Sequence, residues 1–315
     1  MSTKPDLSAL FGSQEITTFL GLESCENFEN LKADVAIVGL PCATPYKSVG
    51  AYCANGPNAI RKAMAPFAAN LTHHDFDLGS PLIPEGKSIV DCGDLAFDEG
   101  DGASNRKSIR DAVGKILETG AVPIVLGGDD SIPIPMLQAF EGRGKYTILQ
   151  IDAHIDWREE FQGERWGLSS TMRRASEMPH IDNIIQVGQR GIGSARPADV
   201  QDALAWGVHF VPARDVAHSG AETALSFIEP GSQVIICFDV DAMDPAIMPG
   251  AIGRAPGGLS YWNMVDLIEG VAQRAKIAAL DVVEFMPECD VDQIGALNVG
   301  RIVATAAGLI CRQSR

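Results

Sequence analysis

Residues 147–157 read TILQIDAHIDW, an apolar run that leads directly into the acidic sequence DAHID at 152–156. A second run, QVIICFDVDAMDP at 233–245, behaves in the same way and carries DVD at 239–241. Near-continuous apolar runs of this length are typical of parallel strands that are covered on both faces. The two stretches therefore predict buried parallel strands whose carboxyl ends carry carboxylates.

Similar runs recur along the whole chain. They predict strands at 34–40, 88–93, 122–128, 147–153, 183–189, 208–213, 233–240 and 276–285. Helical patterns lie at 104–118, 261–275 and 292–311. Repeated alternation of strands and helices predicts an α/β fold with a doubly wound parallel sheet. We expect a polar N-terminal arm at 1–33 and a single domain at 34–315, because no linker divides the rest of the chain.

The composition limits the possible partners and the compartment. The chain has 315 residues, of which 46% are hydrophobic and 21% charged, as expected for a globular protein with a substantial core. A net charge of −16 argues against nucleic acid or a membrane surface as the main partner and is compatible with a small cationic substrate. Seven scattered cysteines, without a signal peptide or a long apolar segment, predict reduced thiols in a cytoplasmic protein.

Carboxylates gather at the ends of three predicted strands, in the sequences GGDDS (127–131), DAHID and DVD. Alternate side chains of a strand project to the same side, and sites in doubly wound sheets form beyond the carboxyl ends of the strands. Carboxylates that converge without lysine or arginine repel one another, and carboxylate oxygens with imidazole suit Mn²⁺, Ni²⁺ or Fe²⁺. A lone D-x-D motif is more often a cap or a turn, but the motifs together predict a metal site.

The order of these motifs resembles the ureohydrolase family, the arginase–agmatinase group. The matching sequences include LGGDDS (126–131), QIDAHIDW (150–157), CFDVDAMDPAIMPG (237–250) and ALDVVEFMP (279–287), and lesser matches extend the resemblance over residues 34–290. The resemblance implies a three-layer α/β/α sandwich with an eight-stranded, mostly parallel sheet, usually assembled as trimers or hexamers. It also implies hydrolysis of a guanidino C–N bond by a hydroxide that two divalent ions, Mn²⁺ or Ni²⁺, share.

The resemblance also assigns roles to individual residues. Asp152 and Asp239 would bridge both ions, His154 and Asp241 would complete one site, and Asp156 would serve the other.

Glu284 matches the family glutamate that binds the guanidinium group of the substrate, a charge-assisted contact. Taken alone, Glu284 could equally be an ordinary charge at a strand end. In this family the loops at 41–55, 157–170 and 242–253 would border the substrate pocket.

Two positions depart from the family pattern. Asp130 stands where the family has a metal-binding histidine, because GGDHS reads GGDDS here. Aspartate can bind a divalent ion, but five carboxylates facing two divalent ions leave a charge of −1, which raises the pKa of the shared water.

The second departure is Trp166, which stands where the family usually has a histidine that shuttles protons or binds substrate. Indole cannot act as an acid or base. Trp166 would either line a surface for an alkylated cationic substrate or simply pack.

Two functions from different classes remain open. The first is an agmatinase-like, metal-dependent hydrolase of a small cationic guanidino compound, which releases urea or a related product. The second is a catalytically impaired subunit that supports an active paralogue in a hetero-oligomer, as in heteromeric hydrolases of alkylated guanidines or biguanides such as metformin. A nucleotide-binding Rossmann protein is disfavoured, because GLPCATPYKSVG at 39–50 lacks the close glycine spacing that such a protein needs.

Overall fold

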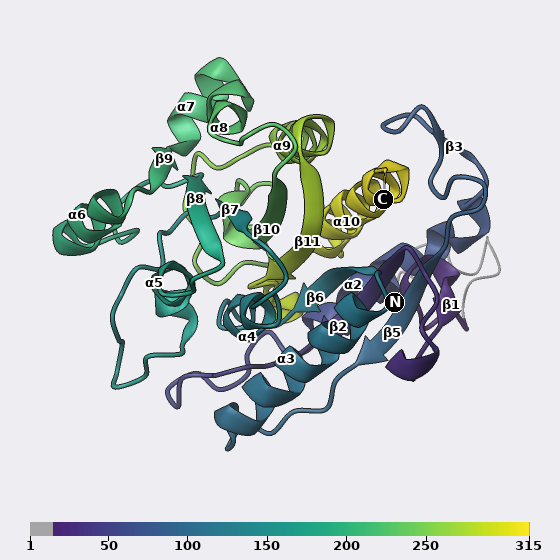
Figure 1. Ribbon diagram of the computed structural model, residues 1–315, viewed down its shortest axis with the longest axis horizontal. Helices are drawn as coiled ribbons and strands as arrows, with labels where there is room; N and C mark the ends of the chain where they lie inside the picture. The colour runs from purple at the N-terminus through teal and green to yellow at the C-terminus, as the bar shows by residue number, and fades with distance from the viewer. Residues whose placement is uncertain (1–14, 315) are drawn as a thin grey trace, which may run out of the picture.

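The computed structural model describes residues 15–314, which form three layers (Figure 1). The central layer is a sheet of nine strands within these residues, in the order β1-β5-β2-β6-β11-β10-β7-β8-β9, and all of its neighbouring strands pair in parallel. The strands are β1 (Glu23–Ser24), β2 (Val35–Leu40), β5 (Ile89–Asp94), β6 (Val122–Gly127), β7 (Tyr146–Ile151), β8 (Ile181–Val187), β9 (His209–Val211), β10 (Gln233–Asp239) and β11 (Lys276–Val283).

The three-layer α/β/α fold that we predicted is confirmed, but the sheet has one strand more than the expected eight. The additional strand, β1, has only two residues, both exposed, so it has no apolar pattern to reveal it. It pairs with the edge strand β5, and the Cys25 N–H beyond it donates to the Asp91 carbonyl at 2.8 Å. Phe19 and Leu20 are also buried in the core, so part of the predicted N-terminal arm packs onto the domain.

Helices cover both faces of the sheet (Figure 1). One layer contains α2 (Gly56–Met64), α7 (Ala213–Ser219), α8 (Glu222–Ser226), α9 (Tyr261–Arg274) and α10 (Ile294–Arg312). The other contains α3 (Gly102–Glu118), α4 (Pro133–Gln138), α5 (Thr171–Ser176) and α6 (Pro197–Trp206). The remaining elements are short: the hairpin β3 (His74–Asp75) and β4 (Ser80–Pro81), and the 3₁₀ helices η1 (Phe19–Gly21), η2 (Phe28–Asn30), η3 (Ala65–Asn70), η4 (Leu168–Ser170), η5 (Val240–Ala242) and η6 (Pro287–Cys289).

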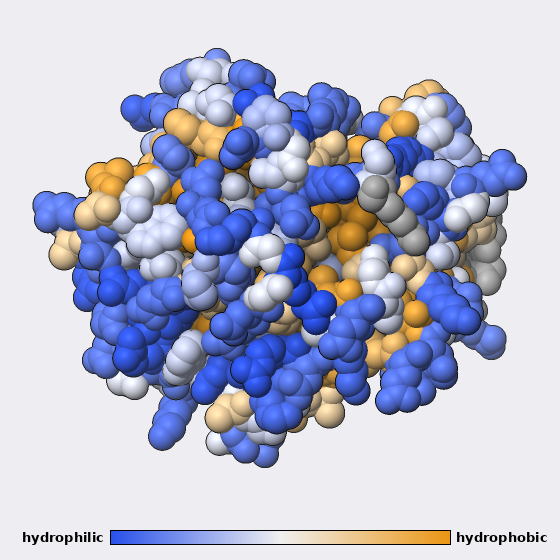
Figure 2. Space-filling view, in the orientation of Figure 1, coloured by the Kyte–Doolittle hydropathy of each residue, from blue (hydrophilic) through white to orange (hydrophobic). Residues whose placement is uncertain are grey.

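Two hydrophobic cores result, one on each face of the sheet. In β2, Val35 and Ile37 belong to the first core, whereas Ala36 and Val38 belong to the second. This alternation follows from the period of two along a strand, and it explains why β2 is apolar on both faces. The outer surface is correspondingly polar: the face in Figure 2 is mostly hydrophilic, with hydrophobic residues visible mainly in a central hollow.

The helix α10 is the single described helix that is long and apolar enough to span a membrane, with a mean hydropathy of 1.6 over its best window. That window is 72% buried within the fold, where α10 packs against α2 and α9. The apolar character of α10 therefore matches its place as a core helix.

The strand order places four carboxyl ends side by side at the centre of the sheet, those of β6, β11, β10 and β7. The pairing registers bring these ends level. Ile151 pairs with Phe238, and Asp239 pairs with Val283. Asp152 and Asp239 therefore leave the sheet at the same height, with Glu284 one residue further on.

Candidate metal centre

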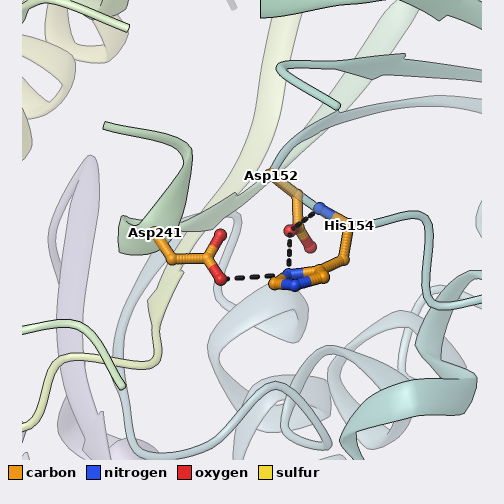
Figure 3. A group of neighbouring side chains, drawn as sticks. All are labelled: Asp152, His154 and Asp241. Carbon is orange, nitrogen blue, oxygen red and sulfur yellow. Dashed lines mark hydrogen bonds and ion pairs between the residues drawn. The ribbon is translucent and has the colours of Figure 1, made fainter. Parts of the chain in front are cut away.

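The first group of possible ligands joins Asp152 and His154, which follow β7, to Asp241, which follows β10 (Figure 3). One ligand atom from each of the three lies within 4.8 Å of the others. Nδ1 of His154 is 3.0 Å from Oδ2 of Asp241 and 3.4 Å from Oδ1 of Asp152. Two carboxylates thus face the same imidazole nitrogen.

A second group consists of Asp130, Asp152 and Asp156, again with ligand atoms within 4.8 Å of one another. Asp152 belongs to both groups, so the two possible ion positions share one carboxylate. Asp156 reaches this position with a φ of +42°, in the left-handed region that residues other than glycine seldom adopt. The turn of the chain after β7 therefore aims both Asp152 and Asp156 inward.

Asp239, which we expected to bridge both ions, lies beside these groups and is a member of neither. Its Oδ1 accepts a hydrogen bond from the Asp241 N–H at 2.7 Å, which turns that oxygen toward the start of η5. Asp239 is nevertheless buried and lines the same cavity as the two groups. The structure thus brings all six predicted metal ligands to one site, with Asp239 at its edge.

Most carboxyl groups of this cluster are difficult to ionise. Burial, followed by repulsion from neighbouring carboxylates, raises the pKa values of Asp130, Asp156, Asp239 and Asp241.

Asp152 and His154 differ from the other members. Although burial opposes ionisation of Asp152, hydrogen bonds with His154 and Asp156 lower its pKa to about 2. Burial also opposes the charged form of His154, but hydrogen bonds to Asp152 and Asp241 raise its pKa to about 12. A cluster of this kind must hold protons or cations to offset its own repulsion, and divalent ions can replace those protons.

Two glutamines that the sequence analysis missed orient the aspartates. Nε2 of Gln150 donates to Oδ2 of Asp152 at 2.7 Å and to Oδ2 of Asp156 at 2.8 Å. Gln186 pairs with Gln150 across β7 and β8, donates to its Oε1, and reaches the Ile155 carbonyl at 2.8 Å. Such hydrogen bonds behind the ligands fix their rotamers. The signal in the sequence was a glutamine inside each of two short apolar runs, ILQI at 148–151 and IIQV at 184–187.

Glu284 follows β11 and lies beside the aspartates, 5% exposed and with a φ of +67°. The Tyr52 hydroxyl donates to its two carboxylate oxygens at 2.7 and 2.8 Å, and the Asp130 N–H donates to Oε1 at 2.8 Å. Burial and the charge of Asp129 raise the pKa of Glu284 to about 8, although these donors favour its anion. Tyr52 lies in a loop that we expected to border the pocket, but no motif singled it out.

A cavity of about 290 Å³ opens above the cluster. The three loops predicted to border it do so, contributing Tyr52, Phe161 and Ile252 among others. Trp166 is not among the lining residues. It is half-buried against the second core, and the Arg106 guanidinium lies 5.4 Å from the centre of its ring. This placement supports packing, and its role in substrate binding stays a prediction.

Comparison with known proteins identifies the relatives of this site. Residues 33–308 match the arginase family, which is most of the chain. The chain belongs to the arginase family. An agmatinase of Pyrococcus horikoshii is 30% identical over 264 residues, which cover 80% of this chain and 83% of that relative. A guanidinobutyrase of Pseudomonas aeruginosa is 28% identical over 285 residues, which cover 87% and 86%.

The fold of this family member also resembles solved structures. Proclavaminate amidino hydrolase from Streptomyces clavuligerus superposes with a TM-score of 0.80 at 25% identity, over 95% of this chain and 98% of that one. The family relatives include enzymes that hydrolyse guanidino C–N bonds, as the agmatinase and arginase names state.

Members of the arginase family normally bind two divalent metal ions, and the residues of this chain fit such ions. Oδ2 of Asp130 is buried and has no hydrogen-bond partner among the described residues. A buried carboxylate oxygen without a donor is costly unless a cation or a proton satisfies it. Oxygen ligands with one imidazole also match the preference of divalent ions such as Mn²⁺ and Ni²⁺.

Proposed function

We propose that this chain hydrolyses the C–N bond of a guanidino compound, in an agmatinase-like reaction that depends on two divalent ions, Mn²⁺ or Ni²⁺. One observation carries the proposal: the two ligand groups that share Asp152 face the same cavity as Glu284. A site for cations and an acceptor for a guanidinium group therefore lie together.

Each ion would have its own ligand group. Asp130, Asp152 and Asp156 would hold one, and Asp152, His154 and Asp241 would hold the other, with Asp239 at the edge. When bound, the two ions supply Lewis acidity and lower the pKa of a water molecule, so that a nucleophile exists near neutral pH.

The residues of the chain position the substrate. In its ionised form, Glu284 would accept hydrogen bonds from the guanidinium group, and the Tyr52 hydroxyl and the Asp130 N–H would hold that carboxylate in place. Water adds to the guanidino carbon and the C–N bond breaks, so that the carbon leaves in urea and the nitrogen leaves as an amine. Burial of the cluster strengthens these electrostatic contacts, because little water screens them.

Elemental analysis and turnover test the proposal together. The protein is purified after expression with manganese or with nickel, and metal per chain is measured before a screen of guanidino compounds. Two ions per chain together with release of urea are expected. A chain that holds two ions and hydrolyses no guanidino compound, alone or with a relative, would overturn the proposal.

Asp130 favours a second function, that of a supporting subunit in a hetero-oligomer of trimeric or hexameric type. Its carboxylate, in place of an imidazole, leaves the two-ion site one negative charge in excess, which weakens the activation of water. In this case a paralogue with GGDHS intact would carry out the chemistry. Co-expression with such a paralogue, followed by size-exclusion chromatography, tests it, and good turnover by this chain alone would exclude it.

A further inference from the structure

A single arginine lines the cavity that the acidic cluster forms. Among the described residues that line it, Arg158 is the one lysine or arginine, whereas five carboxylates of the cluster and Glu284 region, together with Asp199, also line it. We propose that Arg158 binds a carboxylate of the substrate, so that the substrate is a guanidino carboxylic acid. This inference rests on the proposed function for the end of the substrate that reacts.

The guanidinium group of Arg158 is held by an aromatic ring and not by an acid. It lies 4.7 Å from the centre of the Phe161 ring, and Phe161 in turn packs edge-on against Tyr46 at 5.3 Å. Contact with an aromatic ring uses no hydrogen bond, so the N–H donors of the guanidinium stay available to an acceptor. Within residues 15–314, no side chain or carbonyl accepts a hydrogen bond from them.

Two acids near Arg158 already have cationic partners. Glu159 is paired with Arg165 at 2.6 Å and with Arg174 at 2.9 Å. Asp199, which also lines the cavity, is paired with Arg196 at 2.7 Å. The positive charge of Arg158 is therefore available to a ligand.

The backbone fixes Arg158 to the cluster. Arg158 is two residues beyond Asp156, and its N–H donates to the Ser169 carbonyl at 3.0 Å, which closes the loop that carries Phe161. The cavity of about 290 Å³ is at the small end of ligand pockets. Glu284 and Arg158 both line it, so the guanidinium group of a short substrate would lie at Glu284 and its anionic group at Arg158, while a terminal ammonium group would be repelled.

Three substrates of similar length test which charge the cavity prefers at the end of the substrate that does not react. They are 4-guanidinobutyrate, which has a carboxylate there; agmatine, which has an ammonium group; and butylguanidine, which is uncharged at that end. For the metal-loaded protein we expect kcat/KM to be highest for 4-guanidinobutyrate. Arg158→Gln should lower the ratio of kcat/KM for 4-guanidinobutyrate over butylguanidine by about 10- to 100-fold, the effect of losing one charge-assisted contact. Arg110→Gln, an exposed arginine on α3 that does not line the cavity, should leave that ratio unchanged.

Calorimetric titration with 4-guanidinobutyrate and butylguanidine provides a readout that does not need turnover. Tighter binding of 4-guanidinobutyrate than of butylguanidine, with the difference lost in Arg158→Gln, supports the carboxylate site. If these results are obtained and no compound is hydrolysed, only the proposed hydrolysis is wrong. Equal binding of the two compounds, no binding of either, or an unchanged ratio in Arg158→Gln overturns the carboxylate site, even if guanidino compounds are hydrolysed.

Discussion

Asp130 lies at the centre of the candidate site and is 3% exposed. Its backbone is fixed, since its N–H donates to Glu284 and its carbonyl accepts from the Thr171 hydroxyl. Its side chain has less support, because Oδ2 has no partner among the described residues. The free-energy cost of burying the Asp130 carboxylate therefore depends on whether a cation or a proton binds it.

Replacing Asp130 with histidine should strengthen metal binding. Asp130→His removes one buried carboxyl group whose pKa is raised and supplies a neutral imidazole ligand, so the two-ion site becomes electrically balanced. We expect more metal per chain at the same free concentration of Mn²⁺ or Ni²⁺, measured by elemental analysis after dialysis. Asp182→His, an exposed aspartate on β8, is the control. Lower metal content in Asp130→His than in the wild type would show that this carboxylate is the better ligand.

Glu284→Gln keeps the shape of the side chain and removes its charge. Because the guanidinium group then loses a charge-assisted contact, kcat/KM for guanidino compounds should fall by about 10- to 100-fold. Metal content should stay the same, since Glu284 belongs to neither ligand group. Loss of metal in this variant would instead make Glu284 part of the metal site.

At the scale of elements, the ends of the strands determine the geometry of the site. Gly188 follows β8 with a φ of +111°, and a Cβ atom there would lie 2.7 Å from the Asp152 carbonyl oxygen. Gly191, three residues on, has a φ of +69° and open space around it. The two glycines share a positive φ, which would strain any residue with a Cβ atom, but differ in what surrounds them.

This pair permits a matched test. Gly191→Ala should cost about 1 kcal/mol, the cost of a left-handed alanine. Gly188→Ala should cost more and should also reduce metal content, because the clash displaces the backbone of Asp152. Urea unfolding and elemental analysis of both variants measure the difference. Equal losses of stability and of metal content in the two variants would mean that the backbone after β7 moves away from the added Cβ atom at little energetic cost.

Asp281 is buried in the middle of β11, below the cluster. Neither oxygen has a well-formed hydrogen bond, although the Cys237 thiol and the Phe238 N–H face it. Burial raises its pKa to about 7, compared with about 3.9 in an unfolded chain. The stability that protonated Asp281 contributes is therefore complete below about pH 4 and is lost as the pH rises through about 7.

Asp281→Asn should remove this pH dependence. In the presence of a chelator, the free energy of unfolding of the wild type should fall between pH 5 and pH 8 by on the order of 3 kcal/mol more than that of the variant. Urea unfolding at the two pH values gives both numbers. Asp182→Asn serves as the exposed control, and parallel pH curves for wild type and Asp281→Asn would contradict the assignment.

At the scale of the whole molecule, the candidate site connects β6, β7, β10 and β11, which lie at the centre of the sheet. Metal that binds only the folded chain should therefore stabilise the domain as a unit. At a free metal concentration 100 times the dissociation constant, the gain is about 2.7 kcal/mol. Scanning calorimetry with and without chelator should show one transition that moves to higher temperature with metal. A transition that does not move would mean that the site does not bind metal.

The sequence by itself determined the order of the strands along the chain and the residues at their ends. Short, near-continuous apolar runs are typical of strands that are covered on both faces, so eight strands could be predicted from local pattern. The motifs of 150–157 and 237–250 likewise identified the acidic cluster, because consecutive residues at a strand end share one site. In the described part of the central sheet only β1 was not predicted, since two exposed residues carry no pattern, and the short hairpin of β3 and β4 was not predicted either.

Tertiary structure alone decided how distant residues meet. The contacts of Tyr52 with Glu284 and of Gln186 with Gln150 join segments that are 232 and 36 residues apart, and no local pattern encodes such pairings. No local pattern shows that Arg158 lacks an acidic partner among the described residues either, because this depends on the arginines that pair with Glu159 and Asp199 in the folded chain. Ligand identity follows from the chemistry of single residues, whereas orientation and charge balance follow from neighbours that only the folded chain assembles.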